Sequence, residues 1–251
     1  MPDFSLSGRT ALVTGASRGI GRAIAVALAE AGADVVCHST RTAGTDATAE
    51  AVRATGRRAW QAEADLADAD ARARLGDAVL GHTEVDGLVN NAGTIRRAPA
   101  AEHPLADWRH VVETNLTAVF DLCQRFGGPM LARGRGKVVT VASLLSFQGG
   151  VTVPGYTASK HGVAGLTKAL ANEWAGRGVN VNAVAPGYIR TDNTHALQDD
   201  ATRSRQILER IPAGRWGEAA DLGGAVAFLA SDAAAYVHGT VLTVDGGWMA
   251  R

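Results

Sequence analysis

The sequence predicts a single α/β domain in which about seven strands form a mainly parallel sheet covered by helices on both faces. Three observations indicate this fold class. Short runs rich in β-branched residues alternate along the chain with longer, alanine-rich segments of helical period. A glycine-rich turn joins the first of these runs to the first helical segment. No linker, repeat or low-complexity stretch divides the 251 residues, so residues 1–251 are expected to form one doubly wound domain.

The individual elements follow from local composition. Apolar, β-branched runs predict strands at 10–14, 33–38, 58–63, 86–90, 137–143, 179–185 and 240–245. Apolar residues at helical spacing predict helices around 20–31, 45–55, 68–82, 105–126, 156–175, 200–210 and 218–230. The alternation of strand and helix predicts right-handed crossovers, which connect parallel strands.

Residues 190–215 break this alternation. The segment TDNTHALQDDATRSRQ (191–206) is polar and is not followed by a strand. Long irregular or inserted segments in compact domains are often active-site covers. The sequence therefore predicts a helical lid near 190–215.

Composition favours chemistry on a small molecule. The chain has 25 Lys and Arg against 25 Asp and Glu, so it shows no electrostatic footprint for nucleic acid or an anionic membrane. The only cysteines are Cys37 and Cys123, each in an apolar segment, and the N-terminus has no signal-peptide pattern, so a cytoplasmic location is expected. The longest uncharged stretch, 138–159, is interrupted by Gly, Pro and hydroxyl residues and is no membrane helix. No metal-ligand cluster is visible in the sequence.

The glycine-rich turn predicts a dinucleotide site of the Rossmann type. It lies between a strand and a helix, where glycines permit close approach of a pyrophosphate and the helix N-terminus attracts its charge. A turn that serves only strand–helix packing is the alternative. The expected cofactor contacts here are Gly15, Ser17, Arg18, Gly19, Ile20 and Gly21.

Further cofactor contacts are expected where later strands end. NAD enzymes of this architecture usually have an acidic residue after the second strand, but this chain has Ser39, Thr40 and Arg41 there. These residues, with Arg18, suit the 2′-phosphate of NADP, although ordinary solvated turn residues would look the same. After the third and fourth strands, the expected contacts are Asp65, Leu66, Asn91, Ala92 and Gly93.

A serine, a tyrosine and a lysine could supply the chemistry. Tyr156 and Lys160 are four residues apart on an expected helix and therefore share a face. An ammonium near a phenol favours the phenolate and lowers its pKa, which makes tyrosine a usable base. Ser143, at the end of the preceding strand, could donate a hydrogen bond to a substrate oxygen. A tyrosine and a lysine at this spacing are also common as mere surface neighbours.

Together these motifs resemble the short-chain dehydrogenase/reductase family over essentially the whole chain. The matching residues are Thr14 to Gly21, Asn90 to Gly93, Asn115, Ser143, Tyr156 to Lys160, and Pro186-Gly187. The resemblance implies that Tyr156 is the general acid/base and that Lys160 lowers its pKa and holds the nicotinamide ribose. It implies that Ser143 orients the substrate and that Asn115 holds a water of the proton relay. It also implies cofactor contacts from Pro186, Gly187, Ile189 and Thr191, and a homotetramer.

A narrower resemblance, to family members that act on deoxy-gluconate-type sugar acids in uronate catabolism, covers the regions expected to touch substrate. Such a substrate needs a cation for its carboxylate and polar partners for its hydroxyls. We expect Arg96 to hold the carboxylate, and Gln148, Asn193 and His195 to contact hydroxyls. Arg97 is expected to be a solvated loop residue, and Trp216 and Trp248 to be packing or subunit-interface residues.

The sequence leaves open whether the cofactor is NAD or NADP, and it allows alternative functions. The narrower resemblance favours NAD slightly, whereas Arg18 and Arg41 without a nearby carboxylate allow NADP. The alternative functions are a 3-oxoacyl thioester reductase, a dehydrogenase of neutral sugars, and a nucleotide-binding regulator without turnover. The presence of Asn115, Ser143, Tyr156 and Lys160 together argues against the regulator.

Overall fold

The computed structural model describes residues 3–251, apart from the side chains of residues 193 and 196. Its described strands are β1 (Thr10–Val13), β2 (Asp34–Ser39), β3 (Ala59–Glu63), β4 (Gly87–Asn90), β5 (Gly136–Val141), β6 (Val179–Pro186) and β7 (Val241–Val244). They form one seven-stranded sheet in the order β3-β2-β1-β4-β5-β6-β7. Every neighbouring pair is parallel, so the prediction of a mainly parallel doubly wound sheet is confirmed.

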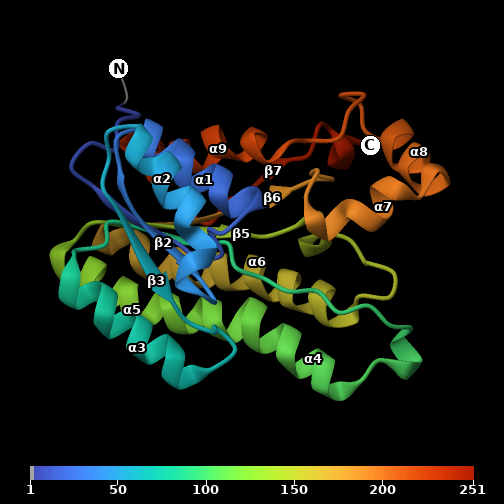
Figure 1. Ribbon diagram of the computed structural model, residues 1–251, viewed down its shortest axis with the longest axis horizontal. Helices are drawn as coiled ribbons and strands as arrows, with labels where there is room; N and C mark the ends of the chain where they lie inside the picture. Colours follow the sequence, from blue (N-terminus) through green and yellow to red (C-terminus); the bar gives the residue numbers. More distant parts are fainter. Residues whose placement is uncertain (1–2) are drawn as a thin grey trace.

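The helices cover both faces of this sheet (Figure 1). They are α1 (Gly19–Glu30), α2 (Asp46–Ala54), α3 (Ala69–His82), α4 (Leu105–Val112), α5 (Ala118–Arg133), α6 (Pro154–Trp174), α7 (His195–Asp199), α8 (Ala201–Arg210) and α9 (Gly223–Ala230). In Figure 1, α1, α2 and α9 lie above the sheet, and α3, α4, α5 and α6 lie below it.

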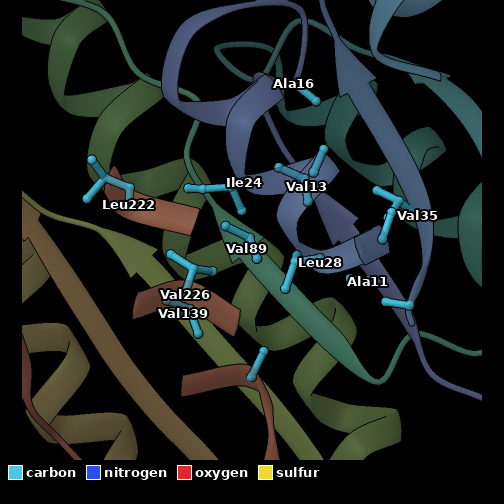
Figure 2. Packing of buried hydrophobic residues seen from close by; sticks show 14 of the residues in the cluster. Ala11, Val13, Ala16, Ile24, Leu28, Val35, Val89, Val139, Leu222 and Val226 are labelled. Atoms are coloured by element: carbon cyan, nitrogen blue, oxygen red, sulfur yellow. The ribbon is translucent and has the colours of Figure 1, made fainter. Parts of the chain in front are cut away.

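Adjacent residues in each strand face opposite cores. Val13 packs with Ile24 of α1 and Val226 of α9 in one buried cluster, shown in Figure 2. Leu12, its neighbour, packs with Phe126 of α5 in the cluster on the other face. Strands covered on both faces must be apolar throughout, which explains why the runs in the sequence are continuous rather than alternating.

The helix expected at 105–126 differs from the prediction in two ways. A π-helical turn, Glu113–Thr117, separates α4 from α5. In addition, α5 continues to Arg133 through Gly127, Gly128 and Pro129, which in a sequence indicate a helix end. Gly127 packs so closely on Trp174 that a Cβ atom there would lie 2.6 Å from the indole, so tertiary packing maintains the helix against local propensity.

Helices α7 and α8 form the inserted segment between β6 and β7 and lie beside the sheet at the right of Figure 1. Ile207 of α8 and Ile211 are buried in a small cluster with Trp216 and Trp248. Among the described residues, no helix is long and apolar enough to cross a membrane.

Candidate active site

A cleft of about 550 Å³ opens at the carboxyl ends of the strands. The strand order reverses between β1 and β4, and ligands of open α/β sheets bind at such a switch point. Nearly all predicted cofactor residues line the cleft: Gly15, Ser17, Arg18, Gly19, Ile20, Gly21, Ser39, Thr40, Asp65, Leu66, Asn91, Ala92, Gly93, Tyr156, Lys160, Pro186, Gly187, Ile189 and Thr191. Arg41 is exposed and is not among the lining residues.

The glycine-rich turn is held against the loop after β4. The side-chain amide of Asn91 donates to the carbonyl oxygens of Thr14 at 2.8 Å and Gly15 at 3.1 Å. The Thr14 hydroxyl oxygen in turn accepts the backbone N–H groups of Asn91 and Ala92, both at 3.0 Å. These bonds hold the glycine-rich turn against the loop after β4, while residues of the turn line the cleft.

Two features fit a nicotinamide dinucleotide. Helix α1 begins after Arg18 without a side-chain cap, so the N–H groups of its first turn are available to an anion such as a pyrophosphate. The Thr114 hydroxyl oxygen belongs to a cleft-lining residue and is buried without a hydrogen-bond partner among the described residues. A polar ligand in the cleft would satisfy both.

His38, at the end of β2, connects three cofactor loops. Its Nδ1 accepts the Gly15 N–H at 3.4 Å, and its Nε2 lies 3.1 Å from the Ala64 carbonyl oxygen. Its own carbonyl oxygen accepts the Ala16 N–H at 2.8 Å. Only 1% of the residue is exposed, and burial lowers the pKa of His38 to about 4. The imidazole is therefore neutral and donates through Nε2. The sequence analysis did not single out this residue.

We expect His38 to make the protein less stable in mild acid. Its pKa is about 4 when folded against 6.5 when exposed, so the unfolded chain binds the additional proton. The stabilisation is complete above pH 6.5 and is lost as the pH falls towards 4, by about 3 kcal/mol in total. Urea unfolding from pH 7.5 to 4 gives the free energy of unfolding of wild type and of His38→Asn at each pH. The difference between the two pH curves is the contribution of His38, because the other titrating groups contribute equally to both proteins. Parallel curves would contradict the assignment.

Positively and negatively charged side chains both lie in the region expected to receive the 2′-end of the adenosine. The Ser39 hydroxyl donates to the Arg41 carbonyl oxygen at 2.5 Å. Arg18 pairs with Asp192 at 3.1 Å, and both side chains are largely exposed. Glu63 accepts hydrogen bonds from the N–H and hydroxyl of Thr42, which lower the pKa of Glu63, with a smaller contribution from Arg41. Each candidate cation for a 2′-phosphate thus already has a carboxylate neighbour.

The predicted catalytic residues meet at the inner end of the cleft. Ser143, Tyr156 and Lys160 all line it. Lys160 is buried, its Nζ donates to the Val141 carbonyl oxygen at 2.6 Å, and it lies 5.6 Å from the centre of the Tyr156 ring. Burial lowers the pKa of Lys160 to about 8. The helical spacing therefore brought the two side chains together as predicted.

The pKa of Tyr156 differs from the expected direction. Burial raises the pKa of Tyr156 from its ordinary value, and this effect exceeds the opposing effects of a hydrogen bond with Ser143 and the positive charge of Arg97. The lowering expected from Lys160 is not seen, because burial lowers the pKa of Lys160 to about 8 and this group loses its own proton before the phenol does. In the free protein the phenol is thus protonated and able to donate a proton.

Asn115 lies in the π-helical turn and is 1% exposed. Its Oδ1 accepts the Thr94 N–H at 2.8 Å, and its Nδ2 donates to the Thr94 carbonyl oxygen at 2.9 Å and to the Ser159 hydroxyl at 3.3 Å. Ser159 donates to the Tyr156 carbonyl oxygen at 2.8 Å. Asn115 thereby fixes the loop after β4 to the helix that carries Tyr156. Its role in a water relay remains a prediction.

The two arginines after β4 differ in their surroundings. Both are exposed and neither lines the cleft, and Arg96 lies 3.8 Å from Asp107. Arg97 places its charge near enough to the Tyr156 hydroxyl to lower the pKa of that group. Arg97 is thus exposed, as predicted from the sequence, and acts on Tyr156 through its charge rather than through a direct contact. Charge alone could not distinguish two adjacent arginines.

The remaining predicted substrate residues lie around the cleft rather than in its lining. Gln148 accepts a hydrogen bond from Trp248 at 3.1 Å. His195 is exposed and pairs with Asp199 at 2.7 Å. The side chain of Asn193 lies outside the described residues. Thr94, His110, Thr114, Asp192 and Thr194 also line the cleft, and none of them was among the contacts predicted from the sequence.

Comparison with known proteins agrees with this geometry. Residues 15–249 match the family model described as enoyl-(acyl carrier protein) reductase. The chain belongs to the short-chain dehydrogenase/reductase family.

Within the family, the chain is 55% identical to the 2-dehydro-3-deoxy-D-gluconate 5-dehydrogenase of Pseudoalteromonas atlantica, over 99% of this chain and 98% of that one. It is 57% identical, with a TM-score of 0.94, to a candidate 2-deoxy-D-gluconate 3-dehydrogenase of Agrobacterium tumefaciens crystallised with NADP, over 99% of each chain. A candidate NAD(P)-dependent gluconate 5-dehydrogenase of Beutenbergia cavernae, crystallised with NADP at low occupancy, is 54% identical with a TM-score of 0.96, over 99% of this chain and 100% of that one.

Proposed function

We propose that the protein is an NAD(P)-dependent oxidoreductase acting on the secondary alcohol or ketone of a deoxy-gluconate-type sugar acid, 2-dehydro-3-deoxy-D-gluconate or 2-deoxy-D-gluconate. The observation that carries the proposal is the placement of Ser143, Tyr156 and Lys160 in one cleft, within range of the charge of Arg97, which lowers the pKa of Tyr156. The first three residues supply proton transfer to a carbonyl. Arg97 adds the positive charge that the carboxylate of an acidic substrate requires.

The chain's own groups account for orientation and proton transfer. When bound, the nicotinamide supplies or accepts the hydride. In the direction of reduction, Tyr156 donates its proton to the substrate oxygen, and Ser143 stabilises the charge developing on that oxygen by a hydrogen bond. In oxidation, Tyr156 accepts the proton. Buried Lys160 keeps a cationic donor 5.6 Å from the tyrosine ring and would hold the nicotinamide ribose.

Arg97, rather than Arg96, is assigned to the substrate carboxylate. A guanidinium pairs with a carboxylate through two parallel hydrogen bonds, and the pair is strongest where water is excluded. Both arginines are exposed, but the Arg97 charge lowers the pKa of Tyr156, whereas the Arg96 side chain lies 3.8 Å from Asp107. The Arg96 side chain also lies 3.5 Å from the Thr94 hydroxyl and so remains tied to its own loop.

Kinetics of two neighbouring variants test the assignment. Arg97→Met is expected to lower kcat/KM for the sugar acid about 100-fold or more, because an interaction with a charged group is lost. Arg96→Met, the matched control, should change it less than about threefold. The measurement follows NADH or NADPH absorbance with 2-deoxy-D-gluconate, a neutral aldose and an acyl thioester. A larger loss of kcat/KM in Arg96→Met than in Arg97→Met would assign the substrate carboxylate to Arg96. Turnover of the thioester or the aldose alone would overturn the proposed function.

The cofactor is proposed as NAD or NADP. The slight expectation of NAD rested on the narrower resemblance and remains a prediction. The absence of a carboxylate at positions 39–41, directly after β2, supports NADP, whereas the pairing of Arg18 with Asp192 reduces the charge available for a 2′-phosphate. The kcat/KM values for the two cofactors in the same assay decide between them.

Assembly, lid and location are also proposals. We propose a cytoplasmic homotetramer on the basis of the family resemblance. Exposed apolar side chains on α4 and α5, namely Leu105, Trp108 and Phe120, support burial of that face against another copy. Light scattering of the purified protein tests the assembly. We further propose that the segment near 190–215, with α7 and α8, covers the substrate within the single domain 1–251.

A further inference from the structure

Trp248, near the C-terminus, reaches back to the loop that follows the catalytic serine. Its indole Nε1 donates a hydrogen bond to Oε1 of Gln148 at 3.1 Å, across 100 residues of sequence. Gln148 itself lies five residues after Ser143, and its N–H donates to the Leu144 carbonyl oxygen at 3.0 Å. The contact therefore connects the C-terminal segment to the loop that begins at Ser143, which lines the cleft, although Gln148 is not itself among the lining residues.

The chemistry of the indole fixes the orientation of the glutamine amide. An indole N–H can only donate, so the atom of Gln148 that faces it must be the carbonyl oxygen. This removes the usual ambiguity between the two ends of a glutamine amide. The NH2 group of Gln148 then points away from Trp248. Gln148 presents donors, and not an acceptor, on its other side.

Trp248 is held rigidly enough to impose this orientation. The residue is 6% exposed, its ring lies 4.7 Å from that of Tyr188, and the Arg210 guanidinium stacks 4.0 Å above it. The Asp245 carboxylate accepts the N–H groups of Gly247 at 2.8 Å and Met249 at 2.9 Å, which closes the turn around Trp248. Gly246 and Gly247 have φ of 64° and 90°, which permits that turn.

Gln148 lies between the catalytic residues and the lid helices. The loop that contains it leads from Ser143 to the start of α6, which carries Tyr156. In the same loop, the Thr152 carbonyl oxygen accepts the Ala98 N–H at 3.0 Å. The loop therefore lies against the segment that contains Arg97. On the other side, Trp248 packs in one cluster with Ile207 of α8. A substrate beside Tyr156 and Arg97 therefore lies next to this loop.

We propose that Trp248 is a positioning residue that orients Gln148 so that its NH2 group donates to an oxygen of the substrate. This rests on the proposed function. The inference narrows the ligand atom to a hydrogen-bond acceptor, that is, a carboxylate, keto or hydroxyl oxygen of the sugar acid. Trp248 itself does not touch the substrate.

A double-mutant cycle tests the inference. Gln148→Ala removes the donor, and Trp248→Phe keeps the ring but frees the amide to rotate. Each is expected to raise KM for the sugar acid about tenfold, and the double variant also only about tenfold, because both remove the same contact. The dissociation constant for NADPH should stay within about twofold in all of them. Trp60→Phe, on β3 and away from this loop, is the matched control.

A third variant separates orientation from mere support. Gln148→Glu still accepts the indole N–H but presents an oxygen in place of the NH2 group, so kcat/KM for the acid should fall by more than about 100-fold. Additive losses in the double variant, or an unchanged KM in Gln148→Ala, would overturn the role of Trp248. Failure of the wild type to turn over the sugar acid would instead overturn the proposed function, before any variant is compared.

Discussion

Replacement of Tyr156 by Phe is expected to lower kcat by about a thousandfold while the affinity for NADPH stays within about twofold. The ring fills the same space, so the change removes only the hydroxyl. That hydroxyl is the group that bonds with Ser143 and experiences the charge of Arg97. Burial raises its pKa from the ordinary value of a tyrosine, so in the free protein it carries the proton that a reduced substrate oxygen needs.

Steady-state rates with the sugar acid and fluorescence titration with NADPH measure the two quantities separately. Tyr236→Phe is the matched control, because Tyr236 is 99% exposed and loses the same atom without a role in the cleft. The control should retain the wild-type rate. If Tyr156→Phe kept more than about a tenth of kcat, another residue would have to be the proton donor.

Replacement of Gly21 by Ala is expected to weaken NADPH binding by about 100-fold or more and to lower the free energy of unfolding by about 2 kcal/mol. A Cβ atom at this position would lie 2.2 Å from the Gly15 carbonyl oxygen and 2.4 Å from Nδ2 of Asn91. Neither neighbour is free to move, because Asn91 Nδ2 also holds the Thr14 carbonyl oxygen at 2.8 Å. The added methyl group must therefore displace the turn that faces the pyrophosphate.

Gly81→Ala is the matched control for this change. Gly81 lies near the end of α3, and a Cβ atom there would have no neighbour within 4 Å. It is expected to stabilise the protein by about 0.5–1 kcal/mol, because alanine loses less backbone entropy in a helix than glycine does. Calorimetric titration with NADPH and urea unfolding measure both variants. Wild-type affinity in Gly21→Ala would mean that the turn does not bind the cofactor.

Local patterns determined most of the fold. The inner strands could be predicted because they are apolar runs buried on both faces, as Leu12 and Val13 of β1 show, whereas the edge strands β3 and β7 are only partly buried. The end of α5 could not, because Gly127 and Pro129 favour a break that the contact with Trp174 overrides. Intrinsic propensities of a fraction of a kcal/mol to a few kcal/mol are small beside the burial of a large aromatic ring.

By itself the sequence determined the sheet, the glycine-rich turn and the pairing of Tyr156 with Lys160, since helical spacing brings those two side chains together wherever the helix lies. Only the tertiary structure brings the charge of Arg97 within range of the tyrosine, connects the cofactor loops through neutral His38, and joins Trp248 to Gln148. The physical reason is the range of the contacts. A helix fixes neighbours within one turn, whereas a loop charge or a bond across 100 residues depends on how whole segments pack.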